Sequence, residues 1–332
     1  MLRDWLKIAR HANYLQRPGY ALRIGVNFFR RLVLRRPVLR SIELAVTYDC
    51  QAQCAKCYAG RLRDPQRAYL TLAEIAAVAD QAMLLGTIHL NLTGGEAILR
   101  PDITAIVRAC HPRQLMVQLT TNGMAVTRDK LVELRAAGLN ALNVSIDTTV
   151  AGDHDRGRVL PGCHAAAVQA VRWARELGLT VCVSTVYARG TRAERDNLER
   201  LLAFAAEERV WLLICDAAAV GGWQGERENM LTPAERTGML REMLRHPQAR
   251  HHTMYNFRGR AGCPAAHEKL YITAYGDVTP CDYLHGAFGN VRTEPLAVVW
   301  QRMRRDPRFS EESTACRMHT EMYRGESGPA GE

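Results

Sequence analysis

From Ser41 to about Arg245 the chain alternates short apolar runs with longer helical patterns, and this alternation limits the possible folds more than any other feature. The predicted strands cover 42–47, 88–93, 115–120, 141–146, 180–186 and 210–215. The predicted helices cover 72–86, 102–110, 128–137, 162–177, 193–207 and 232–245. Strands that alternate with helices form a parallel sheet with right-handed crossovers. The sequence therefore predicts an α/β fold in which six such units build a partial (β/α)6 barrel.

Three cysteines directly follow the first predicted strand. Cys50, Cys54 and Cys57 lie in the run TYDCQAQCAKCYAG with the spacing C-x3-C-x2-C. Folds of this kind place their active sites at the carboxyl ends of the strands. Three thiolates leave one iron of a four-iron cluster without a protein ligand, whereas a structural zinc ion usually takes four protein ligands. The run indicates a cluster with one open iron, and the alternatives are a zinc loop or buried free thiols.

The next three predicted strands also end in residues suited to binding. Two glycines allow close backbone approach to a ligand, and the glutamate after them can accept a hydrogen bond from an ammonium group. Polar groups at the end of the strand over 141–146 suit ribose hydroxyls. These residues are Gly94, Gly95 and Glu96, then Thr121 and Asn122, then Ser145 and Asp147. Each group alone is explained by a turn or a cap, but their order at successive strand ends predicts one shared site.

With these loops in this order, residues 41–220 resemble the radical S-adenosylmethionine (radical SAM) superfamily. The resemblance implies that Cys50, Cys54 and Cys57 ligate a [4Fe–4S] cluster whose open iron is chelated by SAM. It also implies that reduction of the cluster cleaves SAM to methionine and a 5′-deoxyadenosyl radical. A flavodoxin or ferredoxin would supply the electron.

The resemblance also assigns roles in SAM binding. Gly94, Gly95 and Glu96 would hold the methionine amino group. Ser145 and Asp147 would lie near the ribose, and Thr121 and Asn122 would line the pocket. For Arg158 two roles are open, a contact with the SAM carboxylate or a surface salt bridge. The chain departs from the family pattern at Lys56, where an aromatic residue is common, and at Ala97, where proline is usual.

A second cysteine group follows residue 250. Cys263, Gly276 and Cys281, with FGNV after them, are similar to the opening of the SPASM/twitch extension of radical SAM enzymes. The resemblance implies one auxiliary iron–sulfur cluster held by Cys263, Cys281 and Cys316. His319 would be the fourth ligand, or the fourth iron would be open to substrate; a lost cluster is the alternative. We therefore predict a radical SAM core over 41–250, a small α+β module over 251–323 and a disordered tail over 324–332.

The first 40 residues form a basic leader. The chain carries a net charge of +10, and +9 of it lies in residues 1–40, so charge gives no indication of nucleic-acid binding by the rest. A helical projection puts the apolar residues Leu22, Val26, Phe28, Phe29, Leu32 and Val33 on one face, and Arg23, Arg30, Arg31 and Arg35 on the other. Such a helix packs its apolar face on the domain behind it or lies on an anionic membrane.

The sequence thus predicts a radical SAM enzyme that acts on a small molecule or a lipid. The leader is short for a peptide-recognition domain, but a maturase of ribosomal peptides is the alternative within the family. The alternative of another class is a non-catalytic metal-binding scaffold. With no transmembrane run or signal peptide in the sequence, we expect a cytoplasmic protein, and the leader allows peripheral contact with the inner face of the membrane.

Overall fold

One sheet of nine strands organises the computed structural model, which describes residues 17–189, 192–253, 262–309 and 316–317. The strand order is β7-β6-β5-β4-β3-β2-β1-β8-β9, and every neighbouring pair is parallel except β8–β9. The strands are β1 (Ser41–Thr47), β2 (His89–Gly94), β3 (Met116–Thr121), β4 (Ala141–Ser145), β5 (Thr180–Tyr187), β6 (Trp211–Asp216), β7 (Ala249–His251), β8 (Lys269–Ile272) and β9 (Val278–Thr279).

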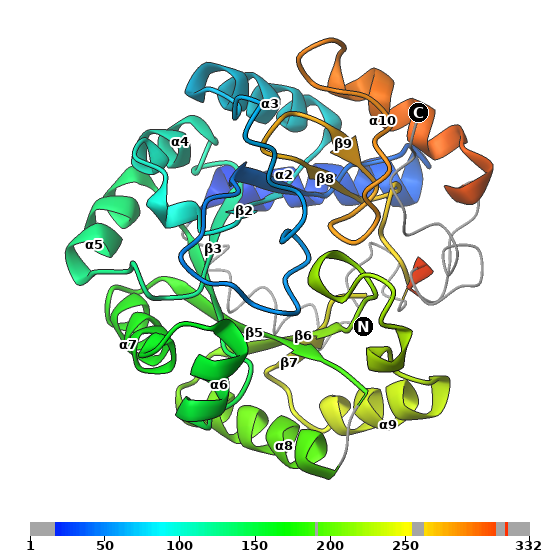
Figure 1. The fold of residues 1–332 in the computed structure, drawn as a ribbon. Helices are drawn as coiled ribbons and strands as arrows, with labels where there is room; N and C mark the ends of the chain where they lie inside the picture. The colour runs from blue at the N-terminus through cyan, green and yellow to red at the C-terminus, as the bar shows by residue number, and fades with distance from the viewer. Residues whose placement is uncertain (1–16, 190–191, 254–261, 310–315, 318–332) are drawn as a thin grey trace.

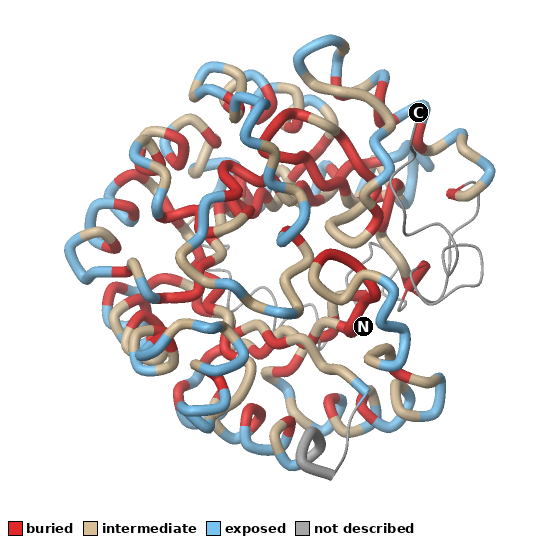
Figure 2. The backbone as a smooth tube through the Cα atoms, in the orientation of Figure 1, coloured by how far each residue is buried: buried red, intermediate tan, exposed pale blue. Residues whose placement is uncertain are grey.

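The helices after α2 (Pro18–Phe28) surround the curved sheet on its outer side, whereas α2 lies near the amino ends of β2 and β3 (Figure 1). The surrounding helices are α3 (Leu72–Leu85), α4 (Ile103–Ala109), α5 (Arg128–Ala137), α6 (Ala151–Arg158), α7 (Cys163–Glu176), α8 (Arg192–Glu207), α9 (Pro233–Leu244) and α10 (Leu296–Arg305). A π-helical turn, η2 (Phe29–Val33), continues α2. Figure 2 shows the strands largely buried and the outer surfaces of the helices exposed, as expected when helices cover a parallel sheet.

The α/β partial-barrel prediction is confirmed. All six predicted strands are present, each displaced by one residue or less at either end, and so are the six predicted helices. Two elements were not predicted: α6, which carries Arg158, and the three-residue strand β7. Because β7 joins the edge of the sheet next to β6, the alternation of strands and helices continues further than predicted.

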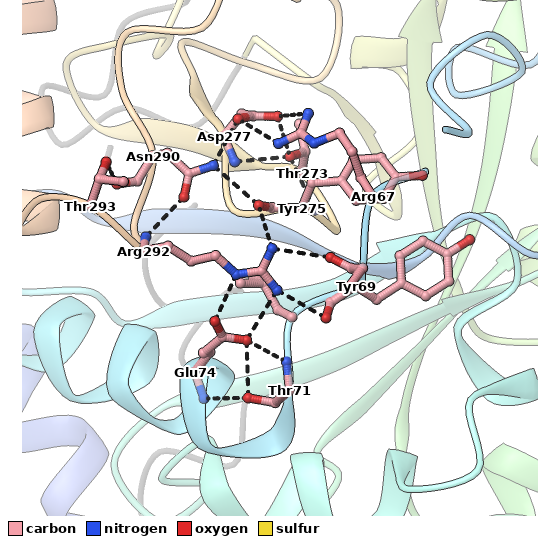
Figure 3. Close-up of polar contacts among 12 residues, drawn as sticks. Arg67, Tyr69, Thr71, Glu74, Thr273, Tyr275, Asp277, Asn290, Arg292 and Thr293 are labelled. Atoms are coloured by element: carbon pink, nitrogen blue, oxygen red, sulfur yellow. Dashed lines mark hydrogen bonds and ion pairs between the residues drawn. The ribbon is translucent and has the colours of Figure 1, made fainter. Parts of the chain in front are cut away.

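The C-terminal segment extends the core sheet. Strand β8 pairs in parallel with β1, in register from Ser41–Lys269 to Leu44–Ile272. Two arginines add polar links, as Figure 3 shows: Arg292 pairs with Glu74 at the start of α3 at 2.6 Å, and Arg67 pairs with Asp277 at 2.7 Å. The hydrogen bond from Arg292 lowers the pKa of Glu74 to about 2. These contacts fix residues 263–309 against the strand that leads into the cysteine loop. The predicted tail, 324–332, lies outside the described residues.

The leader helix is oriented differently from our expectation. The predicted apolar face is turned outward, because Leu22, Val26, Phe29, Leu32 and Val33 are exposed, whereas Phe28 is half-buried. Polar groups instead hold α2 to the barrel. Arg17 donates to Pro112 O at 2.5 Å, Arg23 Nε to Thr87 O at 2.6 Å, and Asn27 to Gly86 O at 2.5 Å. The interpretation that this apolar face packs on the domain is therefore wrong. Residues 1–16 of the leader lie outside the described residues.

Within the described part of the chain, no helix is long and apolar enough to cross a membrane.

Candidate functional site

A cavity of about 1470 Å³ occupies the interior of the barrel. Its wall includes the cysteine loop at the carboxyl ends of the strands and reaches α2, which lies near the amino ends of β2 and β3. Of the predicted SAM-site residues, Gly94, Gly95, Thr121, Asn122, Ser145, Asp147 and Arg158 line this cavity together with Cys50, Cys54 and Cys57. The structure therefore brings the predicted strand-end residues to one cavity, except Glu96, which is not among the residues that line it.

The cysteine loop is surrounded by hydrogen-bond donors. Ala52 N–H donates to Cys50 Sγ at 3.4 Å, and Asn122 Nδ2 donates to the same sulfur at 3.8 Å. Arg158 Nη1 lies 4.0 Å from Cys54 Sγ. Donors and a cation directed at sulfur stabilise thiolates, the form of cysteine that binds metals. The loop thus fits a metal-bound state of its cysteines.

The thiols themselves would be neutral without a metal. Burial raises the pKa of Cys50 and Cys54, and raises that of Cys57 to about 11. A bound metal overcomes this cost, because coordination deprotonates a thiol. Zinc–sulfur bonds of about 2.3 Å would bring the sulfurs of a zinc site to about 4 Å from one another. In the described part of the chain, the sulfurs of these three cysteines do not all lie within 4.8 Å of one another. This wider spacing suits a cluster of several irons better than a single zinc ion.

Glu96 has one oxygen without a partner at this site. Its side chain is fully buried, and Oε2 accepts the Asn122 N–H at 2.7 Å. Oε1 is buried and has no hydrogen-bond partner among the described residues. Burial raises the pKa of Glu96 to about 7. A buried acceptor of this kind is costly unless a ligand donates to it. Oε1 can accept from an amino group, although Glu96 itself is not among the residues that line the cavity.

The two glycines before Glu96 also have a packing role that the sequence did not reveal. A Cβ at Gly94 would lie 1.9 Å from Thr47 O, and one at Gly95 would lie 2.5 Å from Asp49 O. Gly95 N–H donates to Thr47 O, and Glu96 N–H donates to Asp49 O, both at 2.8 Å. The glycines therefore let the end of β2 pack directly against the strand that leads into the cysteine loop.

Asp147 links the cysteine loop to α6. Lys56, the residue before Cys57, pairs with Asp147 Oδ1 at 2.7 Å, and Arg158 pairs with Oδ2 at 2.9 Å. Burial alone would raise the pKa of Asp147, but the charges of Arg158 and Lys56 outweigh it and hold the pKa below its ordinary value. The surface-salt-bridge alternative for Arg158 is wrong, because its side chain and that of Asp147 are both largely buried. Lys56 thus makes an ionic contact at the position where the family often has an aromatic residue.

We predict that Lys56→Met weakens SAM binding about fivefold, since a partly exposed ion pair contributes about 1 kcal/mol. Loss of the pair would loosen the cysteine loop from the end of β4. Equilibrium SAM binding to the reconstituted protein checks this. Lys130→Met is a matched control, because Lys130 pairs with Glu133 on the surface of α5. An unchanged SAM affinity in Lys56→Met would show that the ion pair does not position the loop.

The second cysteine group lies on another part of the same cavity wall. Cys263, Cys281 and Cys316 all line the cavity. A hydrogen bond from Cys316 lowers the pKa of Cys263 to about 6, whereas burial raises the pKa of Cys281. The structure therefore brings together three thiols that are far apart in the sequence. His319, the suggested fourth ligand, lies outside the described residues.

Sequence reasoning missed several residues of this site. Gly221 and Gly222, after β6, press on the cysteine loop: a Cβ at Gly222 would lie 1.7 Å from Ala55 O, and its N–H donates to Cys57 O at 2.9 Å. The two adjacent glycines after the predicted strand over 210–215 are the sequence signal for this close packing. Cys182 and Cys215, which belong to no cysteine motif of the sequence, also line the cavity.

His252 is another missed residue of the cavity wall. Its Nδ1 accepts the Asp216 N–H at 3.2 Å, and burial lowers its pKa to about 3, so the neutral ring carries its proton on Nε2. Nε2 is buried without a partner among the described residues. Its ring contacts that of Tyr283, which in turn contacts Tyr58 beside Cys57. His252 can therefore donate a hydrogen bond to a molecule bound between the two cysteine groups.

Known protein families match both the part of the chain that carries the cysteine loop and the part that carries the second cysteine group. The Radical SAM superfamily model matches residues 44–203, and the SPASM iron–sulfur cluster-binding domain matches residues 263–319. The chain is 30% identical over 233 residues to a GTP 3′,8-cyclase of Marinobacter nauticus, which covers 69% of this chain and 67% of that protein. It is 25% identical over 303 residues to an AdoMet-dependent heme synthase of Methanosarcina barkeri, covering 81% and 85% of the two chains.

A solved structure has the same fold. Streptococcus suis SuiB bound to its precursor peptide SuiA matches with a TM-score of 0.68 at 15% identity, over 87% of this chain and 70% of that one. Fold and site together define an iron–sulfur enzyme built on a partial barrel. The chain belongs to the radical SAM superfamily and carries a SPASM domain. It therefore uses a [4Fe–4S] cluster with SAM, and its SPASM domain implies additional iron–sulfur chemistry.

Proposed function

We propose that Cys50, Cys54 and Cys57 hold the cluster of this radical SAM enzyme, and that the residues lining the cavity around them bind SAM. With SAM bound, such a cluster supplies a 5′-deoxyadenosyl radical that abstracts hydrogen from the substrate or adds to it. The observation that carries the proposal is the convergence of three thiols and their hydrogen-bond donors on one cavity, with the buried Glu96 bonded to the lining residue Asn122.

The chain's own residues bind and orient SAM and enclose the substrate. Glu96 accepts from the SAM amino group, and Ser145 with Asp147 lies on the ribose side. Thr121 and Asn122 complete the pocket, and Arg158 compensates negative charge on the cysteine sulfurs as well as pairing with Asp147. The barrel wall limits access of water, so that the substrate is held beside the reactive carbon.

The test is anaerobic reconstitution with iron and sulfide, followed by reduction in the presence of SAM. We expect a brown protein that produces 5′-deoxyadenosine under these conditions. A protein that binds zinc and leaves SAM intact would instead support the non-catalytic scaffold.

We propose a small molecule or a lipid as the substrate. The cavity volume of about 1470 Å³ exceeds the usual range for ligand pockets, about 300–1,000 Å³, and leaves room for a substrate beside SAM. At its α2 end the cavity is lined by the apolar or aromatic residues Tyr20, Ile24 and Phe28. This lining suits the apolar part of an amphiphile. A flavodoxin or ferredoxin would reduce the cluster, and the leader would keep the protein at the inner face of the membrane.

A peptide substrate is the second candidate, favoured by two similarities. The chain is 27% identical over 274 residues to a PqqA peptide cyclase of Methylocella silvestris, over 77% of this chain and 72% of that one. The solved SuiB structure also contains a bound precursor peptide. The test compares cells that express the wild type with cells that express Cys54→Ala. Their small-molecule, lipid and peptide fractions are analysed separately, and the fraction that contains a product only with the wild type identifies the substrate class.

For the second cysteine group we propose an auxiliary cluster in the 251–323 module, held by Cys263, Cys281 and Cys316 with His319. We predict that Cys281→Ser lowers iron from about eight to about four per chain, if each site holds one [4Fe–4S] cluster. Cleavage of SAM should persist, because the cysteine loop is intact. Iron analysis and 5′-deoxyadenosine production check both parts. An unchanged iron content would exclude Cys281 as a ligand of an auxiliary cluster.

A further inference from the structure

An apolar and basic surface covers the outward side of the leader. We define the leader surface as the exposed large apolar residues of α2, η2 and the residue that follows, together with three of the four arginines of residues 30–36. These residues are Leu22, Val26, Phe29, Leu32, Val33 and Leu34, with Arg30, Arg35 and Arg36. Leu22 is 70% exposed, Val33 62% and Leu32 55%. Six large apolar side chains so close together are unusual on a protein surface and mark an interaction site.

The helix cannot bury this surface by rolling inward. Its opposite side is fixed to the barrel by Arg17, Arg23 and Asn27, which donate to main-chain oxygens near the amino ends of β2 and β3. Asn27 is fully enclosed, at 1% exposure. Rotation would break the hydrogen bonds of these three residues and expose Asn27 in place of the apolar side chains. The outward orientation is therefore a built feature of the fold.

Positive charge surrounds the apolar residues. Arg30, Arg35 and Arg36 have no carboxylate partner among the described residues. Arg304 of α10 lies close enough to Arg31 for their charges to interact, so a second element adds to the basic character. An apolar strip flanked by arginines is the pattern of helices that lie in the interface of an anionic bilayer.

The charge also argues against a second copy of this chain as the occupant. A two-fold interface would place the same surface of each copy against the other. The arginines of one copy would then face those of its partner, which is unfavourable. An anionic lipid surface instead neutralises them while its acyl region accepts the apolar side chains.

We propose that the leader surface docks on an anionic phospholipid bilayer. This inference rests on the proposed lipid substrate and deepens it, because Tyr20, Ile24 and Phe28, on the other side of α2, line the cavity. A docked bilayer would lie at the end of the cavity far from the cysteine loop. The apolar part of a lipid could then enter past α2 while its reacting carbon reaches the site at the other end.

The test is co-sedimentation of the full-length reconstituted protein with vesicles. Phosphatidylcholine vesicles are compared with vesicles that also contain about one-third phosphatidylglycerol. We expect the wild type to bind the anionic vesicles, and Phe29→Glu with Leu32→Glu to reduce this partitioning at least about tenfold. Arg35→Glu with Arg36→Glu should weaken binding to the anionic vesicles only. Val132→Glu is a matched control, since Val132 is 43% exposed on α5, and it should bind like the wild type.

Several results would overturn the proposal. Equal partitioning of the wild type and the Phe29→Glu, Leu32→Glu variant would exclude docking through this surface, as would failure of the wild type to bind. A wild-type dimer in light scattering that the same variant converts to monomers would identify a second copy as the occupant. Iron content and SAM cleavage, measured on every variant, verify folding. Intact SAM cleavage without vesicle binding would reject the docking alone, and absence of SAM cleavage in the wild type would reject the proposed function.

Discussion

Replacement of Cys50, Cys54 or Cys57 by serine is expected to reduce 5′-deoxyadenosine production to the background of a protein-free reaction. Each substitution removes one of three thiolates from the cluster, and serine oxygen is a poor substitute for sulfur at iron. Iron content should fall from about eight to about four per chain, because the auxiliary site is untouched. Iron analysis and chromatographic assay of 5′-deoxyadenosine measure the two effects.

Cys110→Ser is the matched control for this prediction. Cys110 is fully buried between α4 and β3, away from the cavity lining, and burial raises its pKa to about 12. Its loss should leave iron content and SAM cleavage at wild-type levels. SAM cleavage retained in Cys54→Ser would contradict the assignment of this loop as the cluster site.

Glu96→Gln is expected to weaken SAM binding about 30-fold or more, since loss of one partner from a buried charged pair costs about 2 kcal/mol or more. Glutamine preserves the volume and can still accept the Asn122 N–H, but it removes the negative charge. In the free protein burial raises the pKa of Glu96 to about 7, so a large fraction is protonated near neutral pH. The amino group of SAM favours the carboxylate, so binding should release a proton from Glu96.

The coupling between SAM binding and proton release from Glu96 can be measured directly. Because the protonated form predominates below pH 7, SAM affinity should fall as the pH decreases through this range in the wild type. In Glu96→Gln the part of this pH dependence that comes from the Glu96 carboxyl group disappears. Calorimetric titration in buffers of different ionisation enthalpy measures the proton release. The same proton release in both proteins would rule out Glu96 as its source.

The fold was predictable because its signals are local and periodic. Each strand from β1 to β6 is an apolar run bounded by polar residues or turn-forming residues, and the helices between them repeat with helical spacing. Strand β7 has only three residues and a polar sequence, ARH, so its pairing with β6 depends on tertiary contacts. The parallel pairing of β8 with β1 joins residues more than 200 positions apart, which no local pattern reveals.

The candidate site was predictable in its residues but not in their contacts. The strand-end positions of Glu96, Asn122 and Asp147 follow from the order of the strands. The ion pair of Asp147 with Arg158 depends on α6, which was not predicted because its sequence, AGDHDRGR, is polar. The pair with Lys56 depends on how the cysteine loop folds over the end of β4. The leader shows the same limit: a helical projection identifies an apolar face but cannot tell which side faces the protein. Here the hydrogen bonds of Arg17, Arg23 and Asn27 decide it.

Electron paramagnetic resonance of the reduced, reconstituted protein with and without SAM tests the central claim most directly. If three cysteines leave one iron open to SAM, addition of SAM should change the signal of one reduced [4Fe–4S] cluster. That change should be absent in Cys54→Ser and present in Cys281→Ser. A signal insensitive to SAM in the wild type, or a protein that binds zinc and shows no cluster signal, would contradict the account.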